Sequence, residues 1–237
     1  MKLPVLEFLV CVWGVTSANG AMAARHDLFR GTAREAGKIV YFEDHDVLLD
    51  DQGVVLEATT TYKHPDGKIL AILSSDFRKS LNLPDHIFKD ERTMAQYGIR
   101  RDAGKVTLFS KDPGRSENSI MLEDKGDIDR LQVGCQGFNY YIKGRTNFLK
   151  SIRSQPVLFM VPGDLTTYKF VLEYIGETQD QIVDFKVKIE NWFLRAFAPE
   201  LEFRYDKKID RIVWYQGISN IKSNDGKVMN VTIDYKY

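Results

Sequence analysis

Apolar and polar residues alternate along most of the chain, and the alternation is strictest in its C-terminal half. From Val183 to Glu190 every second residue is apolar, and the same holds from Met229 to Tyr237. A period of two is typical of a strand with one buried face and one wet face. Such runs, separated by turn sequences such as His64-Pro65-Asp66-Gly67, predict an up-and-down antiparallel sheet that curls into a barrel or half-barrel.

One segment has the period of a helix instead. Between Gly137 and Ser154, apolar residues recur at spacings of three and four, which places them on one helix face. Such a helix needs a sheet against which to bury its apolar stripe. The predicted fold class is therefore mainly β: a single large curved antiparallel sheet packed on one principal α-helix, at about residues 137–154.

The remaining chain divides into shorter predicted elements within a single β-rich domain, residues 38–237. Residues 24–37 are polar and mixed, which indicates a loose N-terminal arm or a short helix. The other predictions are a three-stranded meander over 38–49, 54–63 and 69–77, weaker strands at 87–100, 105–110 and 120–122, and a short helical turn at 192–198.

The N-terminus has the order of a secretory signal peptide. Lys2 precedes an apolar run from Leu3 to Val15, and small residues lead to Ala21-Met22-Ala23. The run is too short to span a bilayer, so we expect cleavage after Ala23 and no transmembrane segment afterwards. The expected signal peptide is residues 1–23, and the expected localisation is the periplasm.

The charge balance argues about the kind of partner, and the cysteine content argues about disulfide bonds. The 237 residues carry 33 basic and 33 acidic side chains, a formal net charge of zero. This balance argues against nucleic acid as a main partner. Cleavage would remove Cys11 and leave Cys135, which cannot form an internal disulfide alone and reads as a small buried hydrophobe.

The densest group of candidate ligands is Glu43-Asp44-His45-Asp46. A strand sends Asp44 and Asp46 to one side and Glu43 and His45 to the other, so at most half converge on one ion. The spacing fits neither an EF-hand loop nor a zinc motif, and no metal or cofactor is expected. The common nucleophile, metalloprotease and phosphate-binding motifs are also absent from the sequence, which favours a non-enzymatic protein.

The apolar faces of the helix and sheet allow two interpretations. A half-barrel with a helix lid can enclose an acyl chain, in which case the lining side chains come from the helix and two facing strands. Alternatively Phe170, Phe185, Phe203 and Trp214 fill a solid core. The residues expected to line an apolar ligand are Phe138, Tyr141, Ile142, Leu149, Ile152, Phe170 and Phe185.

Several short motifs carry a resemblance. They are Gly137-Phe138, Pro156-Val157-Leu158-Phe159-Met160-Val161-Pro162, Asn191-Trp192-Phe193-Leu194-Arg195, Tyr215-Gln216-Gly217-Ile218-Ser219-Asn220-Ile221, Tyr41-Phe42-Glu43-Asp44-His45 and Tyr62-Lys63-His64-Pro65-Asp66-Gly67. On these motifs the chain resembles a family of uncharacterised exported proteins of Gram-negative bacteria, which implies export and names no chemistry. The strand order also looks similar to that of periplasmic lipoprotein carriers of the Lol type, whose curved sheet and helices hold acyl chains.

Three functions follow as hypotheses. The first is an exported periplasmic protein that binds a lipid-like or other apolar ligand, without enzymatic activity. The alternative is a structural or interaction protein of the cell envelope with a filled core, which binds a partner through a sheet edge or loop. The third is a hydrolase with an unrecognised site near His45.

Overall fold

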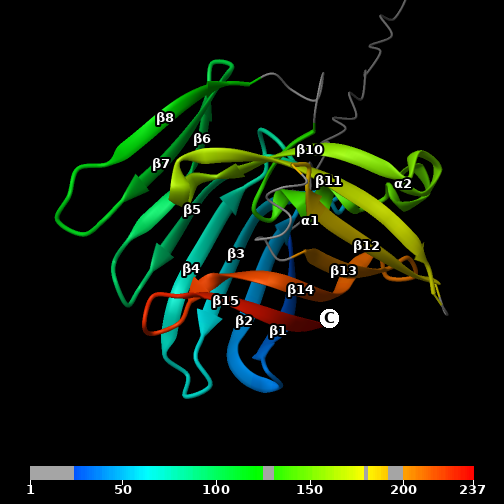
Figure 1. The fold of residues 1–237 in the computed structure, drawn as a ribbon, viewed down its shortest axis with the longest axis horizontal. Helices are drawn as coiled ribbons and strands as arrows, with labels where there is room; N and C mark the ends of the chain where they lie inside the picture. Colours follow the sequence, from blue (N-terminus) through cyan, green and yellow to red (C-terminus); the bar gives the residue numbers. More distant parts are fainter. Residues whose placement is uncertain (1–23, 125–130, 179–180, 192–199) are drawn as a thin grey trace, which may run out of the picture.

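The computed structural model describes residues 24–124, 131–178, 181–191 and 200–237, and it places fifteen strands in one open sheet (Figure 1). The strand order is β8-β7-β6-β5-β4-β3-β2-β1-β15-β14-β13-β12-β11-β10-β9. Neighbours in the sheet are neighbours in sequence except β1 and β15, so the two ends of the described chain pair in the middle of the sheet. The predicted fold class, one large curved antiparallel sheet, is confirmed.

The strands are β1 (Arg25–Glu35), β2 (Lys38–Leu49), β3 (Val55–Lys63), β4 (Ile69–Asp76), β5 (Asp85–Asp90), β6 (Gln96–Asp102), β7 (Lys105–Lys111), β8 (Asn118–Glu123), β9 (Leu131–Gly134), β10 (Ser154–Val161), β11 (Thr166–Glu177), β12 (Ile182–Ile189), β13 (Leu201–Asp206), β14 (Arg211–Lys222) and β15 (Val228–Lys236).

The predicted principal helix is in fact two short helices, α1 (Gly137–Ile142) and α2 (Thr146–Ile152). Gly144 separates them with φ +71°, a backbone conformation that interrupts a right-handed helix. Its N–H donates to the carboxyl of Asp210 at 3.2 Å, so a tertiary contact fixes the break. Both helices lie in the connection between β9 and β10, the one parallel pair recorded among the described strands, and parallel neighbours require such a crossover.

The predicted loose arm at residues 24–37 is wrong, because most of this segment is strand β1. The buried positions of β1 are Gly31, which has no side chain, and Ala33, which has only a methyl group, so the sequence shows no apolar alternation there. β1 is ordered by pairing with β2 on one side and β15 on the other. The single strand predicted over 87–100 is likewise two, β5 and β6, joined by a turn in which Met94 N–H donates to Asp90 O at 2.7 Å.

Buried residues form separate apolar clusters, one under the helices and one between the two ends of the sheet. The helices cover the inner face of β9–β14, where Tyr141, Ile142 and Leu149 contact Phe185 and Phe203 within one apolar cluster. A separate cluster joins the two ends of the sheet: Met160 of β10 packs with Leu83 and with Ile99, Val106 and Leu108 of β6 and β7. The sheet therefore overlaps itself through side-chain packing instead of closing by hydrogen bonds.

Two sequence predictions lie outside the described residues: the signal peptide at 1–23 and the helical turn at 192–198. Neither described helix is long and apolar enough to cross a membrane.

Candidate functional site

The seven residues predicted to line an apolar ligand lie together, and most of them pack on one another. Tyr141, Ile142, Leu149 and Phe185 are buried, and Phe138 and Phe170 pack against the same cluster. The Phe185 ring stacks on Phe203 at 5.2 Å between centroids, and Phe138 meets Phe203 edge-on at 5.3 Å. Ile152 differs, since 37% of it is exposed. Whether any of these residues contacts a ligand stays a prediction.

Two recesses in the described part of the chain lie elsewhere. The larger, about 540 Å³, is an open depression on the outer face of β12–β15, lined by residues that include Arg204 and Trp214. The filled-core interpretation of the sequence places Trp214 in the core; in the structure it is half-buried on the outer face, and the Arg204 guanidinium lies 4.6 Å from the centre of its ring. The smaller, about 390 Å³, lies beside residues 77–81. None of the seven predicted lining residues borders either recess.

A chain of hydrogen bonds runs inside the sheet from Ser75 to Glu43. Ser75 Oγ donates to Gln136 Oε1 at 2.9 Å, and Gln136 Nε2 donates to Thr60 Oγ1 at 2.7 Å. Thr60 Oγ1 lies 2.8 Å from His45 Nδ1, and His45 Nε2 lies 3.2 Å from Glu43 Oε2. With the His45 proton on Nε2, every bond runs in the same sense, and each donor has an acceptor.

Aromatic side chains surround the Glu43 end of this chain. The Tyr235 hydroxyl donates to Glu43 Oε2 at 3.2 Å, and Phe29 stacks on the His45 ring at 4.3 Å. Burial, with a further contribution from nearby Glu43, raises the pKa of Tyr41, Tyr62 and Tyr235 above its ordinary value of 10.0. These phenols are therefore hydrogen-bond donors and acceptors in neutral form at physiological pH.

The order Thr60–His45–Glu43 has the connectivity of a nucleophile, a base and an orienting carboxyl. Its surroundings favour an architectural role. Thr60 is fully buried, and its oxygen already accepts from Gln136, so the hydroxyl offers no face to a substrate. Since Gln136 immediately precedes α1, the chain of bonds ties the start of the helices to β2, β3 and β4. Cys135 beside it is no nucleophile either, because burial raises the pKa of its thiol to about 12.

The sequence predicted half of this arrangement. Glu43 and His45 share the inner side of β2, as expected from strand geometry, while Asp44 and Asp46 face out. Outside, Asp44 pairs with Arg30 and Lys63, and Asp46 with His26. The described residues contain no group of three or more side chains that would hold a metal ion.

Thr60 was missed, although its position gives a signal: it is a polar residue on the apolar face of β3, between Ala58 and Tyr62. Gln136 carries no such signal, because its role depends on where the chain turns into α1.

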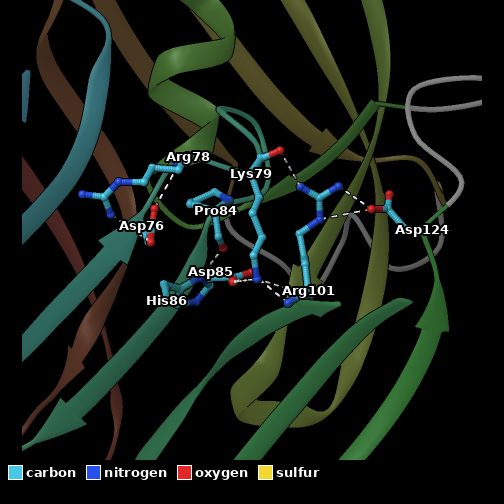
Figure 2. Close-up of polar contacts among 8 residues, drawn as sticks. All are labelled: Asp76, Arg78, Lys79, Pro84, Asp85, His86, Arg101 and Asp124. Carbon is cyan, nitrogen blue, oxygen red and sulfur yellow. Dashed lines mark hydrogen bonds and ion pairs between the residues drawn. The ribbon is translucent and has the colours of Figure 1, made fainter. Parts of the chain in front are cut away.

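A second polar cluster, here called the clasp, consists of Lys79, Asp85, Arg101 and Asp124 (Figure 2). Lys79 Nζ donates to Asp85 Oδ2 at 2.7 Å and to Arg101 O at 2.6 Å, and Arg101 Nε donates to Asp124 Oδ2 at 3.1 Å. Arg101 and Asp124 expose only 17% and 16% of their side chains. The clasp holds the segment after β4 to β5, β6 and the end of β8.

The segment held by the clasp also covers the β9 edge of the sheet. Asn82 O accepts a hydrogen bond from Gly134 N–H at 3.1 Å. A Cβ added at Gly137 would lie 2.0 Å from the same oxygen, so only glycine permits this approach. All four residues of β9 are buried. One edge of the sheet is thus closed by the chain itself.

Comparison with known proteins assigns neither a family nor a function to the chain. No protein-family model and no curated protein matches the chain. A solved structure, described as a beta-barrel-like protein of domain of unknown function DUF1849 from Brucella abortus, matches 90% of this chain and 95% of its own, with 9% identity and a TM-score of 0.35. A likeness at that level carries no argument about function, so the chain is best described by its own structure: an open, overlapping β-sheet with an internal polar chain.

Proposed function

We propose that this is an exported, non-enzymatic interaction protein of the cell envelope, which binds an extended segment of a partner protein along the open edge of its sheet at β8. This is the second of the sequence hypotheses. The observation that carries it is the contrast between the two sheet edges: β9 is buried, whereas β8 has no strand beyond it among the described residues.

The open edge presents main-chain groups in a regular array. Asp124 N–H donates to Gly104 O at 2.9 Å, so it points toward β7. The main-chain N–H groups of successive residues in a strand point alternately toward one neighbouring strand and away from it. The N–H groups of Ser119, Met121 and Glu123 therefore point away from β7. Natural sheets usually protect such an edge with lysine, proline or a bulge, and residues 118–123 contain neither lysine nor proline.

The side chains of β8 suit a partner strand as well. Met121 is 66% exposed, and Ile120 and Leu122 pack against the apolar cluster that joins the ends of the sheet. A strand added here would gain main-chain hydrogen bonds from the edge and specificity from alternate side chains. The clasp holds the end of β8 through Asp124, so the edge is ordered before a partner arrives.

The first sequence hypothesis, an apolar ligand between sheet and helices, has less support. The space between β12, β13 and α1 contains the mutual contacts of Phe138, Phe185 and Phe203. The third hypothesis, a hydrolase near His45, also has less support, because the Thr60 hydroxyl is buried and already hydrogen-bonded to Gln136.

The test uses a photo-crosslinking amino acid at Ser119 in the full chain expressed in its own cells. We expect a crosslinked partner whose yield falls strongly with Met121→Pro, which removes one outward N–H, and persists with Met121→Ala, which keeps that N–H and removes the side chain. Thermal unfolding of both variants checks that the fold is intact. Absence of a specific crosslink, or equal yields from the two variants, would overturn the proposal.

A further inference from the structure

The connection between α1 and β10 carries an exposed apolar pair. Phe148 and Ile152 of α2 are 50% and 37% exposed, and they lie four residues apart, on one side of the helix. Leu149 is buried in the core cluster, so α2 is fixed against the sheet and does not rotate to bury the pair. Ile175 of β11 is 51% exposed. In sequence it lies between Tyr174, whose ring the Arg153 guanidinium contacts, and Glu177, which pairs with Lys150 of α2.

Four cations surround this pair, and only one of them, Lys150, has a carboxyl partner among the described residues. We call residues 143–153 the α2 tip; it contains Lys143, Arg145, Lys150 and Arg153 and no acidic residue. Lys150 pairs with Glu177 at 3.3 Å, a carboxyl that Lys207 also contacts. Among the described residues no carboxyl group lies within ion-pair distance of the other three, all of which are exposed residues.

The two arginines are held by contacts other than ion pairs. The Arg145 guanidinium lies 4.9 Å from the centre of the Tyr141 ring and donates to Tyr141 O at 3.2 Å. The Arg153 guanidinium lies 5.4 Å from the centre of the Tyr174 ring. The nearby Asp210 carboxyl is engaged by the Gly144 N–H and the Tyr205 hydroxyl. The α2 tip is thus a pre-positioned basic surface whose charge is only partly compensated, with an aromatic and an aliphatic side chain at its centre.

We propose that the α2 tip is a membrane-contact surface that docks on anionic phospholipid. Phe148 and Ile152 would enter the boundary between headgroups and acyl chains, and the cations would pair with lipid phosphates. The charge excludes a second copy of the chain as the natural occupant, since two such tips would bring like charges together. Because the tip offers only two partly exposed apolar side chains, the attachment is peripheral and reversible.

The position of the tip suits this role. α2 lies at the periphery of the molecule, on the side opposite β8 (Figure 1). A protein lying on a membrane through α2 would keep its open edge directed away from the lipid. The proposal does not depend on the β8 interaction, so the two succeed or fail separately.

The experiment is co-flotation of the purified chain lacking residues 1–23 with phosphatidylcholine vesicles that contain phosphatidylglycerol, compared with vesicles of phosphatidylcholine alone. We expect binding only to the anionic vesicles, weakening as salt is added. Lys143→Gln should lower the partition coefficient roughly fivefold, since one cation near an anionic surface contributes about that factor. Phe148→Ser should lower it about tenfold or more.

Matched variants separate this surface from general stickiness. Lys38→Gln removes an exposed cation from the first residue of β2, and Ile87→Ser removes an apolar side chain that is 44% exposed on β5. Both should bind as the unaltered protein does. In the Phe148→Trp variant, tryptophan fluorescence should shift to shorter wavelength on binding, and the unaltered protein is the reference for the shift. Failure to float with anionic vesicles, or equal loss in the control variants, would overturn the proposal, as would a stable dimer that the Phe148→Ser change dissolves.

Discussion

His86 is buried at the start of β5, with 3% of its surface exposed, and its Nδ1 contacts Pro84 O at 3.3 Å (Figure 2). Burial lowers the pKa of the imidazole to about 4 from its ordinary value of 6.5. Gly134 packs against its ring near the overlap of the sheet ends. The neutral imidazole is thus part of the core where the sheet meets its own edge.

This burial makes stability depend on pH. Because the folded pKa lies below the unfolded one, the contribution is fully present above pH 6.5 and is lost as the pH falls through 4. The gap corresponds to about 3 kcal/mol of unfolding free energy. We expect urea titrations of the unaltered protein and of His86→Gln to diverge by this amount between pH 7 and pH 4, with the unaltered protein losing more. Parallel pH profiles would show that His86 titrates normally in the folded state, whatever the stability of the variant at pH 7.

Phe185 tests the core at the same scale. Its side chain is 1% exposed and stacks on Phe203. Phe185→Ala removes a large apolar side chain from a packed site, and we expect the free energy of unfolding to fall by about 3–5 kcal/mol. Phe148→Ala, at a half-exposed position, should change it by about 0.5 kcal/mol or less. Similar losses in the two variants, measured by denaturant titration, would contradict the assigned burial.

At the scale of elements, the paired helices pack on the sheet through Tyr141 and Ile142 of α1 and Leu149 of α2, and the start of α1 is tied to β3. Leu149 is 2% exposed and belongs to the same cluster as Phe185, and Gln136 links the start of α1 to Thr60. Each helix is too short to be stable alone, so both depend on this packing. The sequence left open whether the space under the helices is filled or hollow. A larger side chain at position 149 distinguishes the two, because only a hollow space can accept it without loss of stability.

We expect Leu149→Trp to lower the free energy of unfolding by about 1–3 kcal/mol, because a filled core has no room for the larger side chain. Phe148→Trp, one residue away on the exposed side, is the matched control and should be close to neutral. Thermal melts report the stability, and native mass spectrometry of protein isolated from cells reports any bound lipid. An unchanged melt together with loss of a co-purifying acyl species would instead favour the apolar-ligand hypothesis.

At the scale of the whole molecule, the sheet is centred on the pair β1 and β15, so its integrity depends on the first described residues. β1 begins at Arg25, and it pairs with β2 from Arg25 onward. Cleavage after Ala23 would leave β1 complete. Removal of further residues would take away pairing from the middle of the sheet, where strands on both sides rely on it.

We expect protein recovered from the periplasm to begin at Ala24, as the order of charged, apolar and small residues in the leader indicates. N-terminal sequencing or intact mass measures this directly. Replacing Ala21 and Ala23 by bulky residues should cause the uncleaved form to accumulate. An intact Met1 on protein found in the cytoplasm would contradict export. A start beyond Glu35 would remove β1 altogether.

The sequence determined the strands whose side chains alternate. β12 and β15 begin and end within one residue of the predicted runs and have the expected facing, because each buries one face, and a period of two leaves little choice of register. The inner position of Glu43 and His45 followed from the same geometry. The sequence also predicted a helical segment packed against the sheet, since an apolar stripe on a helix requires burial.

Only the tertiary structure decided the rest. β1 carries no alternation, and its order comes from two neighbours that lie far from each other in the chain, β2 and β15. The break at Gly144 depends on Asp210, and the polar chain depends on Gln136 meeting Thr60. The closed edge at β9 and the open edge at β8 depend on where the segment after β4 folds back. Pairing, capping and edge coverage are long-range contacts, whereas periodicity records only which face of each element is buried.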